Sequence, residues 1–478
     1  MRNANGSGHE QRRQTDGPGK DEVNRMNDFR KTAQEMLEFI RISPTCFHAV
    51  ANIGRMLEAA GFQQLQEKEE WKLEKGGRYY TERNDSSVIA FVIPEKEVGI
   101  RGFHMAAAHS DSPCFKIKEK PELTVEKHYL RLNTEKYGGM ILSTWLDRPL
   151  SVAGRLAVKN GNGIEGRLVN IDRDLCVIPN VAIHMNREMN KGVEYNPQVD
   201  LLPLLADVSF DEYDAHTTYD AQTASENAEE QPEAVEKPTL VALAAETAGV
   251  DAETILGEDL FLYTRQEGKM IGAKGEFVLS PRLDDLQSAF ALTKAFTEST
   301  PAEYINLCAV FDNEEVGSGT RQGADSTFLE DTLQRITEGL QEGHSTYLRW
   351  VADSFLISAD NAHAVHPNHP EKADPANRPY LNGGIVIKYH GSQKYTTDGI
   401  SAARMKDYCE RAKVPYQTYT NRSDIAGGST LGNISTAHVS VSSVDIGLPQ
   451  LAMHSAVETA GMKDTEYAVR ALKEFWGE

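Results

Sequence analysis

Five apolar segments of this 478-residue chain each end in Asp, Glu or His. The most compact example is AVFDNEEVGSG at 309–319, where a run typical of a buried strand meets Glu314 and Glu315 and then a glycine-rich turn. A carboxylate removed from water is costly unless a positive charge compensates it. The fold must therefore either leave these acids in water or gather the ends of several buried strands around a cation.

The other four junctions have the same form. They are HMAAAHSD with His109 and Asp111, FVLSPRLDD with Asp284 and Asp285, FLISADNAH with Asp360 and His363, and VDIGLPQLAMHS with His454. In open α/β sheets, ligand sites lie beyond the carboxyl ends of the strands. We therefore expect these side chains, which are remote in sequence, to meet in one crevice.

The residue types in this group are typical of a metal centre. Two histidines and three or four carboxylates suit divalent zinc, manganese or cobalt, and the negative charge suffices for two ions that share a carboxylate. A Glu-Glu pair supplies one ligand and one general base. Each junction alone has a simpler interpretation, since Asp285 would equally cap a helix beginning at Leu286. The combination favours a dimetal site.

Strand and helix patterns alternate towards both ends of the chain, which predicts the α/β class with a mixed sheet flanked by helices. The middle is instead rich in short β segments, including NVAIHM at 180–185, and KNGNG at 159–163 is a hairpin signal. These segments predict an inserted antiparallel β domain. We expect a disordered tail at 1–26, one catalytic α/β domain formed by 27–119 and 270–478, and the insert at 120–269.

The formal net charge of −21 argues against binding to nucleic acid or to an anionic membrane. Nine Asp and Glu residues but one Lys lie at 211–238, which we interpret as a solvated loop of the insert. The five cysteines include no C-x-x-C pair, the N-terminus lacks a signal-peptide core, and no apolar run is long enough for a bilayer. These features predict a cytoplasmic location.

Taken together, the motifs resemble a known family. Between about residues 28 and 474, the chain resembles the aspartyl and vacuolar-type metalloaminopeptidases in the segments AHSDSP, TWLDRPLSVAGR, IPNVAIHMNR, SPRLDDL, DNEEVGS, SADNAHAVHPN, GIVIKYHGSQKY, RSDIAGGSTLGN and PQLAMHS. The resemblance implies a co-catalytic dizinc exopeptidase fold with an inserted dimerisation domain. It also implies a homo-oligomer, a tetrahedral dodecamer built from dimers.

The same resemblance implies roles for individual residues. His109, Asp284 and Asp360 would hold one Zn²⁺, and Asp284, Glu315 and His454 would hold the second, with Co²⁺ or Mn²⁺ as alternative metals. Glu314 would be the general base, and Asp111 would orient His109. The implied substrate contacts are His184, reaching into a neighbouring subunit's site, and His363, Lys388 and Tyr395 in the substrate pocket.

The substrate contacts also have structural interpretations, because Lys388 would simply end a strand, His184 would lie in the core and Tyr395 would pack at the surface. The predicted function is that of an aminopeptidase acting on peptides. Lys388 would face an acidic first side chain, so we expect a preference for N-terminal Asp or Glu. The alternatives are a neutral or leucyl aminopeptidase of the same family, a dimetal N-acyl amino acid amidohydrolase, and a non-catalytic assembly protein.

Overall fold

Four buried strands form the parallel centre of a nine-stranded sheet. The computed structural model describes residues 20–95, 99–207, 239–425, 427–428 and 430–478. The central strands, in spatial order, are β13 (Ile305–Phe311), β4 (Phe103–His109), β14 (Phe355–Ala359) and β18 (Ser442–Gly447). Almost every residue in them is buried, as expected for parallel strands that are covered on both faces. Their carboxyl ends therefore lie along one edge of the sheet.

Antiparallel neighbours on both sides make the sheet mixed. β3 pairs antiparallel with β13, and β16 pairs antiparallel with β18. The outer strands are β1 (Gln63–Gln64), β2 (Arg78–Arg83), β3 (Ser87–Val92), β16 (Ile385–Tyr389) and β17 (Tyr416–Thr420). The predicted α/β class, a mixed sheet flanked by helices, is confirmed.

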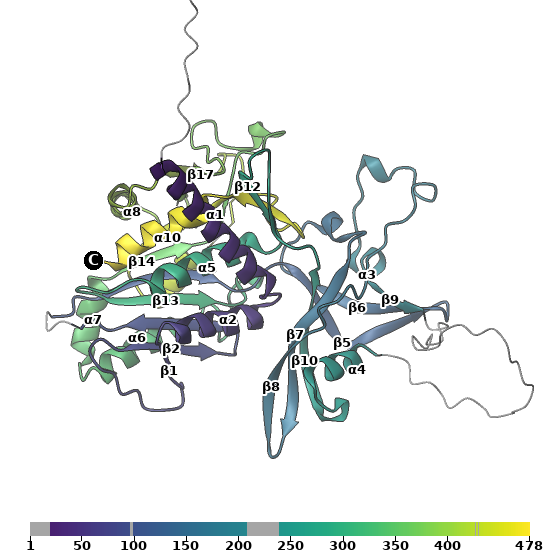
Figure 1. Cartoon of the computed structure of the whole chain (residues 1–478), viewed down its shortest axis with the longest axis horizontal. Helices are drawn as coiled ribbons and strands as arrows, with labels where there is room; N and C mark the ends of the chain where they lie inside the picture. Colours follow the sequence, from purple (N-terminus) through teal and green to yellow (C-terminus); the bar gives the residue numbers. More distant parts are fainter. Residues whose placement is uncertain (1–19, 96–98, 208–238, 426, 429) are drawn as a thin grey trace, which may run out of the picture.

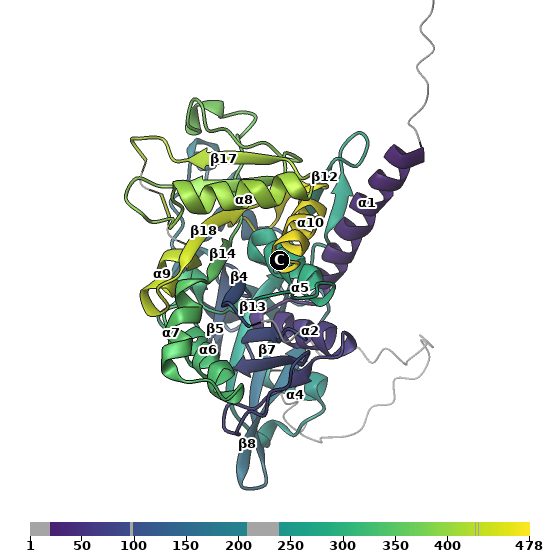
Figure 2. The ribbon, with the colours of Figure 1, turned by 90° about the vertical axis from the view of Figure 1, so that its left-hand side faces the viewer.

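Helices cover both faces of this sheet (Figure 2). One face packs against α1 (Lys20–Arg41), α2 (Cys46–Ala59), α5 (Leu283–Thr297), α8 (Gly399–Arg411) and α10 (Asp464–Trp476). The other packs against α6 (Phe328–Gly339), α7 (His344–Ala352) and α9 (Leu431–His438). Helix α1 begins before the expected Asp28, because Met26 also packs against the core and extends the helix. Residues 20–26, expected within the N-terminal tail, are therefore helical.

A second, six-stranded sheet extends to one side of the α/β layers (Figure 1). All its pairings are antiparallel. Its strands are β5 (Cys114–Val125), β6 (Tyr129–Tyr137), β7 (Leu150–Asn160), β8 (Gly163–Asn170), β9 (Leu204–Asp207) and β10 (Ile255–Thr264), and α4 (Leu240–Ala248) packs on it. The predicted hairpin joins β7 to β8 through Gly161, whose φ is +58°. The predicted boundary at 119/120 falls inside β5, and residues 211–238 lie outside the described residues.

Two segments differ from the sequence-based expectation. The strand in FVLS is β12 (Phe277–Ser280), which belongs to a small third sheet and not to the central one. That sheet contains β11 (Lys269–Ile271), β12, β15 (Ala362–His363), β19 (Pro449–Leu451) and β20 (Glu458–Gly461). The NVAIHM segment is not a strand: Met185 donates its backbone N–H to Ala182 O and closes a turn. Its alternating apolar side chains are exposed, and the segment pairs with no strand among the described residues.

Candidate metal centre and active site

Six acidic and histidine side chains meet beyond the carboxyl ends of the central strands. They come from the end of β4, the first turn of α5, the short 3₁₀ helix η4 (Glu314–Val316), the end of β14 and the turn between β19 and β20. These side chains form three groups, and within each group the potential ligand atoms lie within 4.8 Å of one another. The groups are His109–Asp284–Asp360, Asp284–Glu315–His454 and His109–Glu314–Glu315. The first two are the ligand sets that the sequence suggested, and Asp284 is common to them.

Asp284 lies between the two histidines because the first turn of α5 departs from helical geometry. Its φ and ψ are −85° and 107°, and its peptide bond to Asp285 is cis. Oδ1 of Asp284 lies 3.6 Å from His109 Nε2, and Oδ2 lies 3.5 Å from His454 Nε2. Each carboxylate oxygen thus faces a different histidine, which is the arrangement required of a bridging ligand.

Hydrogen bonds to backbone carbonyls define the tautomer of both histidines. His109 Nδ1 donates to Asp111 O at 3.1 Å, and His454 Nδ1 donates to Gly139 O at 2.7 Å. Because a carbonyl oxygen only accepts, each Nδ1 carries a hydrogen, so Nε2 is the ring nitrogen that each neutral imidazole would offer to a metal ion. Both Nε2 atoms face Asp284 and are therefore the atoms available to a metal ion.

The buried carboxylates of this centre do not have enough hydrogen-bond donors and positive charges nearby to compensate their negative charge. Asp284 Oδ1 and Glu315 Oε1 are buried without a hydrogen-bond partner. Burial raises the pKa of Glu314 to about 7 and also raises the pKa values of Glu315 and Asp360, with further contributions from neighbouring acids. Divalent cations would compensate this charge and satisfy the unpaired oxygens, so the residues fit a dimetal centre.

Asp111 lies next to His109, as expected, and also contacts the two glutamates. It orients His109 through its backbone carbonyl, while its carboxylate Oδ1 lies 3.4 Å from His109 Nδ1. The carboxylate instead accepts the backbone N–H groups of Glu314 and Glu315, both at 3.1 Å. Asp111 therefore supports the two glutamates as well as the histidine.

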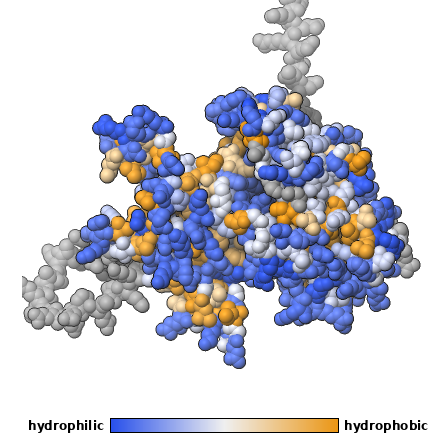
Figure 3. All heavy atoms as spheres, turned by 180° about the vertical axis from the view of Figure 1, so that it is seen from behind, coloured by the Kyte–Doolittle hydropathy of each residue, from blue (hydrophilic) through white to orange (hydrophobic). Residues whose placement is uncertain are grey.

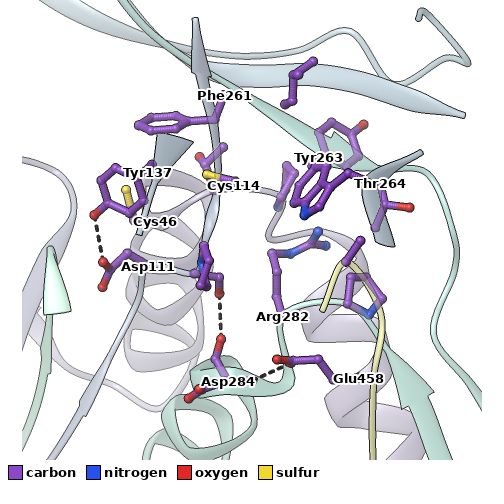
Figure 4. Close-up of a pocket in the computed structure, with 18 of the residues that line it drawn as sticks. Cys46, Asp111, Cys114, Tyr137, Phe261, Tyr263, Thr264, Arg282, Asp284 and Glu458 are labelled. Carbon is purple, nitrogen blue, oxygen red and sulfur yellow. Dashed lines mark hydrogen bonds between the residues drawn. The ribbon is translucent and has the colours of Figure 1, made fainter. Parts of the chain in front are cut away.

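Three residues at the centre were not predicted from sequence, and a fourth, Asp285, makes a contact other than the helix cap considered for it. Glu458 accepts the backbone N–H groups of His454 at 2.7 Å and Asp284 at 3.0 Å, and Figure 4 shows it beside Asp284. Asp285, considered as a helix cap, instead accepts the His109 N–H at 3.2 Å. The other two are Ser112, which donates to Asp284 O, and Tyr137, which donates to Asp111. Most of these contacts join segments that are distant in the sequence, so sequence spacing does not reveal them.

Comparison with known proteins identifies the family of this chain. The family model described as aminopeptidase I zinc metalloprotease (M18) matches residues 39–476. The chain belongs to the M18 aminopeptidase family. It is thus a zinc metalloaminopeptidase, a hydrolase that acts on peptides, and neither the amidohydrolase nor the non-catalytic alternative is supported.

Individual M18 relatives cover nearly the whole chain. A probable M18 family aminopeptidase 2 of Clostridium novyi (strain NT) is 46% identical over 448 residues, which is 93% of this chain and 98% of the relative. The solved Ape4 and Nbr1 complex contains a chain that is 36% identical, with a TM-score of 0.86 over 95% of this chain and 86% of that chain. The S. cerevisiae mApe1 dodecamer is 25% identical, with a TM-score of 0.78 over 94% and 97% of the two chains.

Lys388 lies beside the metal centre of this M18 aminopeptidase. It is buried at the end of β16, and its Nζ lies 3.6 Å from Asp360 Oδ2 and 5.5 Å from the centre of the Tyr395 ring. Tyr395 is also buried, in a small cluster with Ala362 and Tyr419. His363 follows Ala362 in β15, and its exposed ring lies 6.1 Å from that of Tyr419. The three predicted pocket residues thus lie around one small cluster next to Asp360.

His184 is outside this group. It lies in the segment between β8 and α3 (Pro197–Asp200), which projects from the six-stranded sheet as an arm (Figure 1). The His184 side chain is exposed and belongs to none of the three groups of ligand atoms found among the described residues. The alternative interpretation of His184 as a core residue is wrong. Around it, Val181, Ile183 and Met185 are also exposed.

Proposed function

We propose that this M18 aminopeptidase holds two zinc ions per chain and releases N-terminal acidic residues from peptides, with Glu314 as the general base. The observation that carries this proposal is the pair of three-residue ligand groups that share Asp284. One carboxylate with an oxygen towards each histidine fits two neighbouring ions better than one.

His109, Asp284 and Asp360 would hold one ion, and Asp284, Glu315 and His454 would hold the other. When bound, the ions supply Lewis acidity towards the first peptide carbonyl and lower the pKa of water. Glu314 belongs to neither ligand set, so its carboxylate is free to take a proton from the attacking water and to return it to the leaving amine. Burial raises its pKa above the ordinary value, towards the range that suits both transfers near neutral pH.

The acidic preference is supported by the surroundings of Lys388. Among the described residues, Asp360 is the one carboxylate that forms an ion pair with the ammonium group of Lys388. If a metal ion takes the charge of Asp360, the buried ammonium group loses its ion-pair partner. A substrate carboxylate would then be its partner, which favours the aspartyl branch of the family over a neutral or leucyl preference.

We further propose that the chain assembles into a dodecamer, as the mApe1 relative does. The exposed apolar side chains of the arm support burial against another copy, and Figure 3 shows hydrophobic patches on the arm and near the tip of the six-stranded sheet. In the described parts of the chain, no helix is both long and apolar enough to cross a membrane. The five cysteines are unpaired, which supports a cytoplasmic location.

Metal analysis tests the dizinc assignment. The purified enzyme should contain two zinc ions per chain, lose activity on chelation and regain it when Zn²⁺, Co²⁺ or Mn²⁺ is added back. His109→Ala and His454→Ala should each lower the metal content, because each removes a ligand from one set. One ion per chain in the fully active enzyme, or unchanged metal content in both variants, would disprove the assignment.

Paired substrates test the acidic preference. Lys388→Met keeps the length of the side chain but removes its charge, so kcat/KM should fall more on an N-terminal aspartyl substrate than on a leucyl one. Lys394→Met is the matched control, because Lys394 donates to the backbone carbonyl of Gly427 and is paired with no carboxylate among the described contacts. Equal losses on the two substrates in Lys388→Met would show that Lys388 supports the site without selecting the side chain.

A further inference from the structure

We propose that the segment from Tyr137, the last residue of strand β6 (Tyr129–Tyr137), to Ile141 positions the metal ligands of its own chain. Tyr137 is the main positioning residue, and the inference rests on the dizinc assignment made above. The segment contacts Asp111, Glu315 and His454. The inserted domain would therefore set the geometry of the active site, in addition to any role in contacts between copies.

The first contact is the hydrogen bond from Tyr137 to Asp111. The Tyr137 hydroxyl donates to Asp111 Oδ2 at 2.7 Å (Figure 4). Its direction is defined, because Asn313 Nδ2 donates to the same hydroxyl oxygen at 2.8 Å and leaves the single Tyr137 proton for Asp111. The Asn313 amide is itself oriented, since its Oδ1 accepts from Thr320 and Gln322, both at 2.8 Å.

Asp111 carries this constraint to the two glutamates. Its Oδ2 also accepts the Glu315 N–H and its Oδ1 accepts the Glu314 N–H, both at 3.1 Å. A carboxylate held by one hydroxyl and two backbone amides has little freedom to rotate. Without the Tyr137 hydroxyl, Asp111 could turn about its side chain, and the backbone that carries the base and one metal ligand would become less well placed.

The next residues of the segment contact the other ligands directly. Gly138 has a φ of +78°, and a Cβ there would lie 3.1 Å from Glu315 Cβ, so its backbone packs closely against that ligand. Gly139 O accepts the hydrogen of His454 Nδ1 at 2.7 Å. Ile141 N donates to the carbonyl oxygen of His454 at 2.9 Å. Both non-bridging ligands of the second proposed ion are therefore contacted by the short segment that directly follows strand β6.

Tyr137→Phe tests the positioning role in the full-length, zinc-loaded enzyme. Tyr263→Phe is the matched control, because Tyr263 is a buried tyrosine of strand β10 in the same sheet, and its hydroxyl bonds to Asn170 at 2.7 Å, away from the ligands. We expect Tyr137→Phe to lower kcat by about 10–100-fold, the usual effect of losing a hydrogen bond behind a metal ligand. KM should change by less than about twofold, because the hydroxyl contacts no substrate.

Zinc affinity, measured by competition with a chelator, is the readout that a purely structural role would not change. It should weaken in Tyr137→Phe and stay at the wild-type value in Tyr263→Phe, while the melting temperatures of the two variants stay similar. The visible absorption of the Co²⁺-substituted enzyme should also change in Tyr137→Phe alone. Gly138→Ala should give a larger loss through direct contact with Glu315, and it provides a second test if Tyr137→Phe folds poorly.

The two assignments fail in different ways. Fewer than two ions in the active wild-type enzyme would disprove the dizinc proposal whatever the variants do. Equal kcat, equal zinc affinity and equal Co²⁺ spectra in Tyr137→Phe and Tyr263→Phe, with two ions bound, would overturn the positioning role alone. A loss of kcat in Gly138→Ala without any change in metal affinity would likewise contradict it.

Discussion

Glu314 and Glu315 are adjacent in the chain but have different surroundings. Glu315 Oε1 lies 3.4 Å from His454 Nε2, among the ligands of the second proposed ion. Glu314 groups with His109 and Glu315 but belongs to neither ligand set that contains Asp284. The short 3₁₀ helix η4, which begins after Asn313 in a left-handed conformation, turns successive side chains in different directions. This local geometry allows two identical residues to take different roles.

The pH dependence of catalysis should report the ionisation of Glu314. Burial, together with nearby acids, raises its pKa to about 7, and bound cations would lower it from there. A base must be unprotonated, so kcat/KM should fall as the pH decreases through a pKa between the ordinary value of about 4.3 and about 7. The measurement is a pH profile of kcat/KM, with the metal content determined at each pH.

Glu314→Gln is the control for that profile. It should keep two ions but lose about 10²–10⁴-fold in kcat. The fall of activity at low pH that protonation of Glu314 causes should be absent from the pH profile of the variant. A variant with near-wild-type kcat would refute the assignment of the base. An acid limb that coincides with metal loss would show that ligand protonation, and not Glu314, controls the profile.

The proposed metal ligands lie at junctions between strands and loops. The end of β18 shows how closely the backbone is packed at such a junction. Gly447 ends this strand, directly beside the residue that follows β14. A Cβ at Gly447 would lie 2.3 Å from Asp360 O, 2.9 Å from Ala362 N and 2.9 Å from Lys388 Cε. Two of these three atoms belong to the backbone, which has no room to move away. A side chain at this position therefore has to displace Asp360.

Gly447→Ala should destabilise the protein by about 1–3 kcal/mol through overpacking and should also weaken metal binding. The free energy of unfolding and the metal content of the variant test both effects. Gly257→Ala in strand β10 is the matched control, because its Cβ would meet only Ala157 Cβ at an ordinary 3.8 Å. If Gly447→Ala matched this control in stability and metal content, the packing argument at Asp360 would be wrong.

At the scale of the whole molecule, the arm that carries His184 projects from the six-stranded sheet (Figure 1). Its exposed apolar residues would be costly in an isolated protomer and would gain from contact with another copy. This arrangement is consistent with the proposal that His184 serves a neighbouring subunit. Activity would then depend on assembly even when every metal ligand is present.

Mixed assemblies test this cross-subunit role. His184→Ala should lower kcat/KM without changing the metal content. Co-expression of His184→Ala with Glu314→Gln should restore part of the activity, because the second chain supplies His184 to a site that keeps Glu314. Co-expression of His184→Ala with a chain carrying both substitutions should restore none. An active monomer, or mixed assemblies no more active than their parents, would contradict the proposal.

The sequence by itself determined the α/β class and the residues that could bind metal. Continuous apolar runs are typical of strands buried on both faces, and Asp, Glu and His at their ends are metal-binding types, so local patterns carried this information. Such patterns failed where an apolar segment had no partner strand among the described residues, as in NVAIHM, and where β12 joined a different sheet. Sequence spacing contains no information on which strands become neighbours.

Only the tertiary structure decided how the proposed metal ligands are held. The contacts of Tyr137 with Asp111, Gly139 with His454, and Glu458 with Asp284 and His454 join segments that are far apart or show no motif. A hydrogen bond depends on distances and angles of a few tenths of an ångström, which the packing of separate sheets and helices sets. A chain can therefore reveal in its sequence which side chains bind a metal, while the atoms that orient them become evident only once the chain has folded.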